Sequence, residues 1–428
     1  MDSTNTTISS NSVERKADQK AERKIEISTV LNTAVIVSAL GYFVDIYDLL
    51  LFSILRVPSL KSLGVPSDQL LTEGVRLINL QMIGMLIGGI FWGVVGDKKG
   101  RLSVLFGSIL LYSLANIANG YVHDVHLYGV LRFLAGVGLA GELGAAITLV
   151  SEVMTKETRG YGTSIVAGVG IMGAVFAALV GDAFSWRVAY MIGGGLGFVL
   201  LILRVSMFES GMYEEIKDQK IPKGDVRMLF NSLPRFLKYL RCILIGVPVW
   251  FVVGILLTFS PELSKALSVS GEITASKAIM WGYLGISLGD FGTGFLSQWI
   301  KSRKKVLLGS MLATLALTAT YFLTRGLTST EFYLLCFALG LGSGYWAMFV
   351  TAGAEHFGTN LRATVTTSIP NLVRGSVVPL TLAFQGLQKS FGMIESGAIV
   401  GGAAIAIALV SYIGLEETYG KDLEFFEK

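Results

Sequence analysis

Apolar residues along this chain of 428 residues occur in blocks of about 20, separated by short polar segments. Crossing a bilayer takes about 20 residues of α-helix, and lipid requires every backbone donor and acceptor to be satisfied internally. The blocks therefore predict an all-α membrane protein. Twelve transmembrane helices are predicted, at residues 28–55, 75–96, 102–120, 127–150, 161–181, 187–207, 239–260, 275–297, 305–324, 331–353, 361–387 and 395–414.

The longest polar interruption follows the sixth predicted helix and divides the chain into two halves of similar length. We expect two pseudo-symmetric six-helix bundles joined by a cytoplasmic linker. The expected parts are an N-terminal tail at 1–27, a bundle at 28–207, the linker at 208–238, a bundle at 239–414 and a C-terminal tail at 415–428.

The two halves repeat a motif. Glu152 and Arg159 follow the fourth predicted helix, and Glu355 and Arg362 follow the tenth, 203 residues later and with the same spacing of seven. Repeated halves in a membrane chain favour alternating access, in which two bundles rock around a site near the membrane midplane.

Composition agrees with a membrane protein, since 52% of the residues are hydrophobic, 15% are charged and the mean hydropathy is +0.62. Most of the 35 Lys and Arg fall in alternate loops, on the side that also carries both termini. By the positive-inside rule both termini are cytoplasmic, and the protein is multi-pass in a bacterial-type inner membrane. Because the net charge of +4 is spread over these loops, no nucleic-acid partner is expected.

Several function classes are disfavoured. Cys242 and Cys336 each stand alone near an apolar helix, and His123 and His126 lie in a short loop, so neither a metal site nor a cofactor is expected. A nucleotide-binding glycine loop is absent from the sequence. An enzyme would need a nucleophile with its base or a metal cluster, so we expect no enzymatic activity.

An isolated charge inside a predicted helix costs roughly 2.5 to 3.5 kcal/mol and is a functional candidate, and three such carboxylates, in the first and fourth predicted helices, are candidates for proton coupling. Asp45 and Asp48 share a helix face with small and polar residues, a face expected to line a central cavity. Two carboxylates this close in apolar surroundings cannot both ionise cheaply, so one should bind a proton. Glu142 is the third candidate for proton coupling. The alternatives are pairing with an arginine for the aspartates and helix packing for Glu142.

Arg374 is the best candidate for binding an anionic substrate, because arginine stays charged and its planar fork matches carboxylate or phosphate. Asn371 lies one turn away. Asp290 could bind substrate, couple protons or pair with Arg374. Arg132 could neutralise Asp45 or Asp48 in one conformation.

Aromatic side chains at similar depth could stack on a substrate. The candidates are Tyr47, Trp250 and Trp346, for which packing or lipid contact is the alternative. Charged residues at the cytoplasmic helix ends could hold the bundles closed. These gate candidates are Asp97, Arg101, Glu152, Arg159, Glu355 and Arg362.

The chain resembles the major facilitator superfamily over its whole membrane region. Residues 93–101 read Gly-Val-Val-Gly-Asp-Lys-Lys-Gly-Arg, which is similar to the superfamily's Gly-x-x-x-Asp-Arg/Lys-x-Gly-Arg motif. Residues 41–49 and 132–160 resemble the metabolite:proton symporters, with the phosphate:proton symporters and sugar porters close behind. The phosphate carriers' Gly-Gly-Asp-Tyr-Pro segment is Ala-Gly-Glu-Leu-Gly at 140–144 here, which disfavours phosphate.

Together these features predict a secondary active transporter that imports a small polar, anionic metabolite by proton symport with alternating access. Its expected partners are the small-molecule substrate, protons and the lipid bilayer, and it is expected to function as a monomer. A proton-coupled antiporter or a uniporter is the alternative, and a membrane enzyme or a channel is the least favoured interpretation.

Overall fold

The computed structural model describes residues 33–99, 101–142, 159–209, 226–420 and 427. Within them the chain is helical, and the one isolated β-bridge joins Ser270 to Thr328. The N-terminal set of helices is α3 (Thr33–Ser62), α4 (Leu70–Lys99), α5 (Arg101–Gly120), α6 (Val125–Leu139), α8 (Arg159–Ala183) and α9 (Trp186–Glu209). The C-terminal set is η1 (Val226–Leu229), α11 (Leu233–Leu244), α12 (Val247–Phe251), η2 (Val252–Leu257), α13 (Ser260–Ala266), α14 (Ala275–Trp299), α15 (Arg303–Leu323), α16 (Ser329–Ser343), α17 (Trp346–Glu355), α18 (Thr359–Gly375) and α19 (Val377–Ile413).

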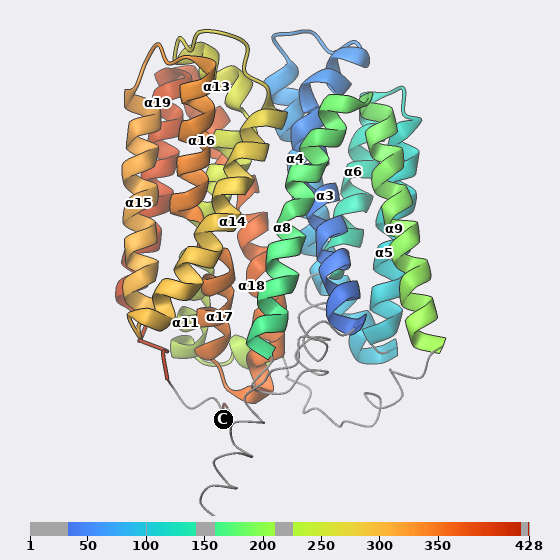
Figure 1. The fold of residues 1–428 in the computed structure, drawn as a ribbon, viewed down its shortest axis with the longest axis vertical. Coiled ribbons are helices and arrows are strands. Elements are labelled where there is room, and N and C mark those ends of the chain that lie inside the picture. Colours follow the sequence, from blue (N-terminus) through green and yellow to red (C-terminus); the bar gives the residue numbers. More distant parts are fainter. Residues whose placement is uncertain (1–32, 100, 143–158, 210–225, 421–426, 428) are drawn as a thin grey trace, which may run out of the picture.

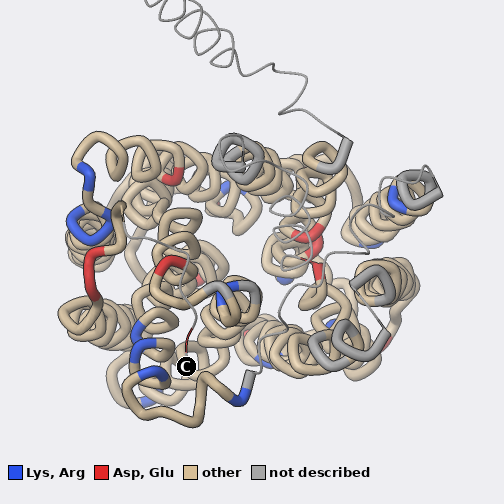
Figure 2. The backbone as a smooth tube through the Cα atoms, turned by 90° about the horizontal axis from the view of Figure 1, so that it is seen from below, with Lys and Arg blue, Asp and Glu red and all other residues tan. Residues whose placement is uncertain are grey.

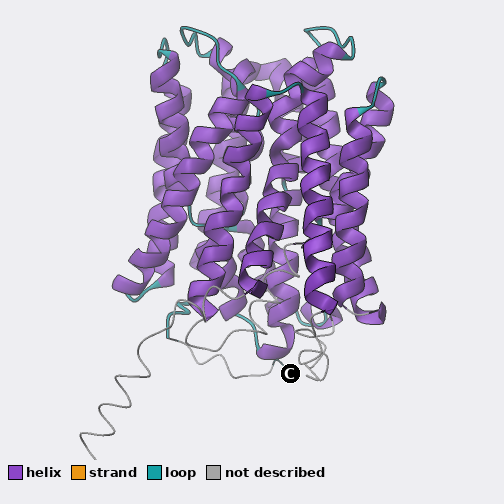
Figure 3. Cartoon of the chain, turned by 45° about the vertical axis from the view of Figure 1, so that its right-hand side comes forward, coloured by secondary structure: helices purple, strands orange, loops and turns teal. Residues whose placement is uncertain are grey.

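The two sets stand side by side, with most helices running along the same direction (Figures 1 and 3). Most are seen nearly end-on when the molecule is turned by 90° (Figure 2). The sets meet where α8 and α3 pack against α14 and where α4 packs against α18 and α19. We call the end that carries the loop 63–69, at the top of Figure 1, the upper end, and the opposite end the lower end.

Glycines bring helices close together in the same way in both sets. A Cβ on Gly136 of α6 would lie 2.0 Å from the carbonyl oxygen of Gln81 in α4, and one on Gly340 of α16 would lie 1.9 Å from that of Gly282 in α14. Such close approach is common between membrane helices, where packing and not the hydrophobic effect drives association. The two glycines are 204 residues apart, in keeping with the repeat in the sequence.

Helix boundaries differ from the predicted ones in several places. Helix α3 runs to Ser62 instead of residue 55, and α11 begins at Leu233, inside the expected linker. Hydropathy missed both extensions because they carry polar and basic side chains. Helix α6 ends at Leu139, and the rest of the predicted span 127–150 beyond Glu142 lies outside the described residues.

Two predicted spans contain breaks that hydropathy cannot detect, because the residues around each break are apolar. The span 239–260 includes a π-helical segment, η2, where both the backbone N–H and the hydroxyl of Thr258 donate to Val253 O, at 3.3 and 2.8 Å. The span 331–353 is interrupted between α16 and α17. Helix α19 bends at Gly392, whose φ of 81° favours glycine, and this bend lies in the predicted gap between the spans 361–387 and 395–414.

The segment after α19 caps the lower end of α15. The carboxylate of Glu417 accepts hydrogen bonds from the Ser302 hydroxyl and from the backbone N–H groups of Arg303 (2.9 Å) and Lys304 (3.2 Å). Partial burial raises the pKa of Glu417, but these hydrogen bonds together lower the pKa by more than burial raises it, to about 2. The ionised carboxylate thereby satisfies N–H groups that the first turn of a helix leaves open.

We expect Glu417→Gln to lower the melting temperature of the detergent-solubilised protein at pH 7 by about 2 to 4 °C, because a helix cap is weakened. Since the folded pKa is below that of an unfolded glutamate, the carboxylate stabilises fully above pH 4.5 and loses this effect as the pH falls toward 2. Glu272→Gln, in an exposed loop, is the control. Equal melting temperatures at pH 7 would contradict the capping role.

Candidate functional site

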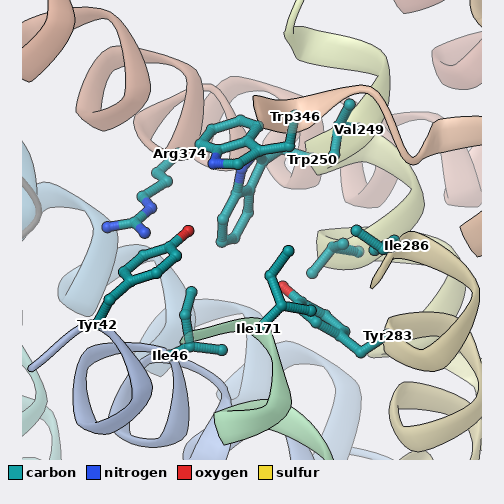
Figure 4. Close-up of a pocket in the computed structure, with 10 residues that line it drawn as sticks. Tyr42, Ile46, Ile171, Val249, Trp250, Tyr283, Ile286, Trp346 and Arg374 are labelled. Atoms are coloured by element: carbon teal, nitrogen blue, oxygen red, sulfur yellow. The ribbon is translucent and has the colours of Figure 1, made fainter. Parts of the chain in front are cut away.

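A small cavity lies where the two sets of helices meet (Figure 4). Its volume is about 20 Å³, little more than one water molecule needs. The lining residues come from α3, α8, α12, η2, α14, α17 and α18. They are Tyr42, Ile46, Ile171, Val249, Trp250, Val253, Tyr283, Ile286, Trp346 and Arg374.

The lining is aromatic and aliphatic, with one charged group among the described residues that form it. The indoles of Trp250 and Trp346 meet edge to face with 6.2 Å between ring centroids, and the Arg374 guanidinium lies 6.0 Å from the Trp250 ring centroid. Figure 4 shows Tyr42 and Arg374 together at one side of the cavity and Tyr283 with Ile286 at the other. Such a lining suits a flat apolar ring that carries one anionic group.

Arg374 forms an ion pair with Asp45 across the two sets. Its Nη2 lies 3.3 Å from Asp45 Oδ2, and both side chains are fully buried. Within the described part of the protein, Nε and Nη1 of Arg374 and Oδ1 of Asp45 have no hydrogen-bond partner. The pair therefore neutralises both charges while leaving donors and an acceptor that a ligand could use.

Asp48 lies deeper in the N-terminal set, near Asn116 of α5 and Arg132 of α6. The Arg132 guanidinium donates to Asn116 Oδ1 at 2.5 Å and lies 4.7 Å from the ring centroid of Tyr190. A Cβ on Gly193 would come within 2.4 Å of Asp48 Oδ1, so this glycine leaves the space that the carboxylate occupies.

Glu142 pairs with Arg204 of α9. The guanidinium Nη1 donates to Glu142 Oε2 at 3.0 Å, Nη2 contacts Oε1, and both side chains are buried. A Cβ on Gly41 would collide with both groups. Glu142 is thus held inside the N-terminal set by an arginine that sequence reasoning missed, although Arg204 lies within the predicted span 187–207.

The face of α3 that lines the cavity differs from the predicted one. Gly41 and Asp48 face into the N-terminal set, whereas Tyr42 and Ile46 line the cavity, and Asp45 lies between the two faces. The prediction was wrong because small and polar residues in membrane helices also mediate close helix packing. Nothing in the spacing tells which neighbour covers which face.

Three other predicted substrate ligands have different contacts. The Tyr47 hydroxyl donates to Ala189 O of α9 at 2.9 Å, away from the cavity lining. Asn371 donates to Ala140 O at 3.2 Å and so connects α18 to the end of α6. Asp290 accepts a hydrogen bond from the backbone N–H of Ala347 at 3.1 Å, and the predicted pair with Arg374 is replaced by the pair with Asp45.

The predicted gate residues are only partly described. Glu152 lies outside the described residues, and the side chains of Asp97, Arg101 and Arg159 do as well. Glu355 pairs with Arg303 at 3.3 Å, and Arg362 donates to Phe357 O at 3.4 Å, and both of these contacts lie within the C-terminal set.

A buried ion pair joins the two sets at the upper end. The guanidinium of Arg56 in α3 lies 2.7 Å from each carboxylate oxygen of Glu262 in α13 and 3.3 Å from Thr258 O. Arg56 is fully buried and Glu262 is 19% exposed. Hydropathy does not indicate this pair, because Arg56 directly follows the predicted helix end at residue 55.

Two further hydrogen bonds cross between the sets. The Ser276 hydroxyl of α14 donates to Ala178 O of α8 at 3.1 Å, and the Thr381 hydroxyl of α19 donates to Asn79 Oδ1 of α4 at 2.8 Å. All these residues lie in the halves of their helices nearer the upper end. The upper end is therefore closed over the cavity.

Comparison with known proteins identifies the family to which the chain is related. The model of the Major Facilitator Superfamily matches residues 34–379. A niacin transporter of Acinetobacter baylyi is 26% identical over 396 residues, which cover 82% of this chain and 87% of that protein. A gentisate transporter of Corynebacterium glutamicum is 24% identical over 435 residues, which cover 97% and 95%.

A solved structure shares the fold. The crystal structure of a D-xylose-proton symporter superposes with a TM-score of 0.67 at 17% identity, and the match covers 91% of this chain and 99% of that one. The family and these relatives are transporters and not enzymes. Given the family match over most of its length, the chain belongs to the Major Facilitator Superfamily.

Proposed function

We propose that this protein imports a small aromatic carboxylate together with a proton by alternating access. The observation that carries the proposal is the buried pair of Arg374 and Asp45, which joins the two sets of helices beside an aromatic cavity. An anion that binds to Arg374, or a proton that binds to Asp45, changes the charge balance of that pair.

The substrate class follows from the lining. One guanidinium can bind a carboxylate, while Trp250, Trp346 and Tyr42 offer faces and edges to a flat ring. A sugar would leave many hydroxyls unsatisfied among these aliphatic and aromatic groups. The names of the two relatives support this class, since niacin and gentisate are both aromatic carboxylic acids.

The coupling follows from competition for Arg374. An ionised Asp45 pairs with the Arg374 guanidinium. When Asp45 is protonated it is neutral, and the guanidinium becomes free to bind the substrate carboxylate. Substrate and proton therefore bind together, and the site stays near neutral in both states. The membrane potential and proton gradient then drive uptake, at about 2.3 kcal/mol per charge for 100 mV.

Asp48 and Glu142 belong to the same proton-coupling system. Each lies next to an arginine of the N-terminal set, Arg132 for Asp48 and Arg204 for Glu142. A proton that reaches either carboxylate frees its arginine to take another partner. Along α3, Asp48 lies on the upper side of Asp45, and Glu142 with Arg204 lies beside Gly41 on the lower side, so exchange along these pairs would carry the proton along the N-terminal set past Asp45.

We propose twelve membrane crossings in two six-helix bundles, at 28–207 and 239–414. Eight helical runs are long and apolar enough to cross, and the run Asn360–Ile413, with 54 residues, is long enough for two crossings. Helices α5, α6 and α14 bring the nine crossings to twelve. The site is built within one chain, so a monomer suffices for transport.

The lower end faces the cytoplasm in this proposal, together with the linker 208–238 and both tails, 1–27 and 415–428. Lys and Arg gather around the lower end of the C-terminal set (Figure 2), as the positive-inside rule requires. They include Arg241, Lys301, Arg303, Lys304 and Lys305. The closed upper end then faces outward, and Arg56 with Glu262 must separate before substrate can enter.

Transport by purified protein in proteoliposomes tests the function. We expect uptake of labelled benzoate or nicotinate to rise about tenfold when an inward proton gradient is imposed. In Asp45→Asn, which mimics the protonated residue, exchange of internal for external substrate should persist while gradient-driven accumulation disappears. Asp182→Asn, an exposed acid at the upper end of α8, is the control. Undiminished accumulation in Asp45→Asn would rule out this residue as the proton site.

Thermal unfolding tests the central ion pair. Arg374→Gln should destabilise the protein by about 3 to 5 kcal/mol, because a buried Asp45 carboxylate loses its partner. Adding Asp45→Asn to this variant should recover a large part of the loss, since no unpaired charge remains. Strictly additive losses in the double variant would show that the two residues do not interact.

Cysteine labelling from outside tests the upper closure. In a Ser276→Cys background, Glu262→Gln should speed modification by an impermeant maleimide about tenfold or more, because the upper ends separate more often. The charge swap Arg56→Glu with Glu262→Arg should restore slow labelling. Glu73→Gln is the matched control, since Glu73 pairs at 2.9 Å with Arg76 on its own helix. An unchanged rate in Glu262→Gln would refute the closure.

A further inference from the structure

A break in the backbone lies beside the cavity, between α16 and α17. Gly344 has φ of −76° and ψ of 66°, and Tyr345 has φ of −130° and ψ of 21°, so neither continues the helix. A break leaves N–H and C=O groups without helical partners. Inside a membrane protein such groups are tolerated only where other groups satisfy them.

Helix α14 satisfies both sides of this break from a single turn. Asp290 Oδ1 accepts the N–H of Ala347 in the first turn of α17, at 3.1 Å. The Thr293 hydroxyl donates to Gly344 O at 3.0 Å. The helices can approach this closely because both contacting residues are glycines, and a Cβ on Gly344 would lie 2.6 Å from the Cα of Gly289.

The charge of Asp290 fits this position. A carboxylate at the N-terminal end of a helix interacts favourably with the partial positive charge there, and Asp290, which is 8% exposed, lies at the start of α17. The backbone N–H of Trp346 approaches the same carboxylate. Arg374, the other partner that the sequence suggested, is taken by Asp45.

The first residue of α17 is Trp346, whose indole lines the cavity. It packs against Trp250 at 6.2 Å and against Phe349 at 5.3 Å between ring centroids. Because α17 starts where Asp290 and Thr293 hold it, these two side chains determine where the Trp346 indole lies. A shift in the first turn of α17 would move one aromatic wall of the cavity.

We propose that Asp290 is a positioning residue which, with Thr293, clamps the break and holds Trp346 against the ring of the substrate. Asp290 then acts on ring selectivity through Trp346 and does not bind substrate or carry the transported proton. This assignment rests on the proposed aromatic substrate. It explains a buried acid that the sequence alone presents as a binding or coupling group.

A matched pair of substrates tests the clamp, namely benzoate and cyclohexanecarboxylate, which differ in the flat aromatic ring. In Asp290→Leu, which cannot accept the Ala347 N–H, we expect the KM for benzoate to rise about tenfold. The KM for cyclohexanecarboxylate should change much less, so the preference for the aromatic acid collapses while Vmax is retained. Asp290→Asn keeps an oxygen acceptor and should retain most of the preference.

A milder variant covers the case in which Asp290→Leu does not fold. Thr293→Val removes the hydrogen bond to Gly344 O, together with the bond of the same hydroxyl to Asp290 O in its own helix, and should reduce the preference for benzoate in the same direction, by about twofold to fivefold. Thr320→Val, which removes a hydroxyl bonded within its own helix at 3.0 Å, is the control and should leave the preference unchanged.

Other outcomes would overturn the inference. If Asp290→Leu and Thr293→Val weakened transport of both acids equally, Asp290 and Thr293 would contribute only to general stability. Loss of gradient-driven uptake with retained exchange in Asp290→Asn would assign proton transfer to the carboxyl group.

The proposed function can fail separately from the clamp. If the wild-type protein transported neither acid, the proposed function would be wrong. The fluorescence emission of Trp346 would still show whether Asp290 positions this indole. Measured against Trp346→Phe, that emission should shift in Asp290→Leu and not in Asp290→Asn. An unshifted emission in Asp290→Leu would overturn the clamp.

Discussion

Charges buried in apolar surroundings must be paired, since removing one partner of a buried pair costs about 3 to 5 kcal/mol. This constraint organises the centre of the protein. Arg204 pairs with Glu142 and Arg132 lies next to Asp48 within the N-terminal set, whereas Arg374 with Asp45 and Arg56 with Glu262 join the two sets. The pairs within one set can persist when the sets move. In the proposed mechanism, the pairs between the sets are exchanged for other partners, and this exchange links the binding of an anion and a proton to movement of the helices.

The backbone follows the same rule as the charges. Where helices near the cavity are irregular, other groups take up the freed donors and acceptors: Thr258 bonds to Val253 O at the end of η2, and Asp290 and Thr293 hold the break before α17. Broken helices at membrane depth are tolerated where they surround a cavity. Here the irregular segments bring Trp250 and Trp346 together. Regular helices would direct these two indoles elsewhere, so the aromatic wall of the cavity depends on the irregular backbone.

Hydropathy could predict the helices because the cost of exposing backbone to lipid applies to every crossing. It could not place the breaks in 239–260 and 331–353, because broken and continuous helices are equally apolar. Intramembrane charge indicated Arg374 as a candidate, and this residue lines the cavity. The lining residues Tyr42 and Ile46 were missed, because periodicity shows which residues share a helix face but not whether that face meets the cavity or another helix. Glu262 was missed because its partner Arg56 is distant in sequence.

The proposed transport mechanism depends on an exchange in which a substrate carboxylate replaces Asp45 at Arg374 as Asp45 takes a proton. The most direct measurement is the pH change of a lightly buffered solution of detergent-purified protein when benzoate or nicotinate binds. We expect protons to be taken up from solution with binding, and we expect this uptake to disappear in Asp45→Asn while binding remains. Binding without proton uptake in the wild-type protein, at a pH where Asp45 is paired with Arg374, would contradict it.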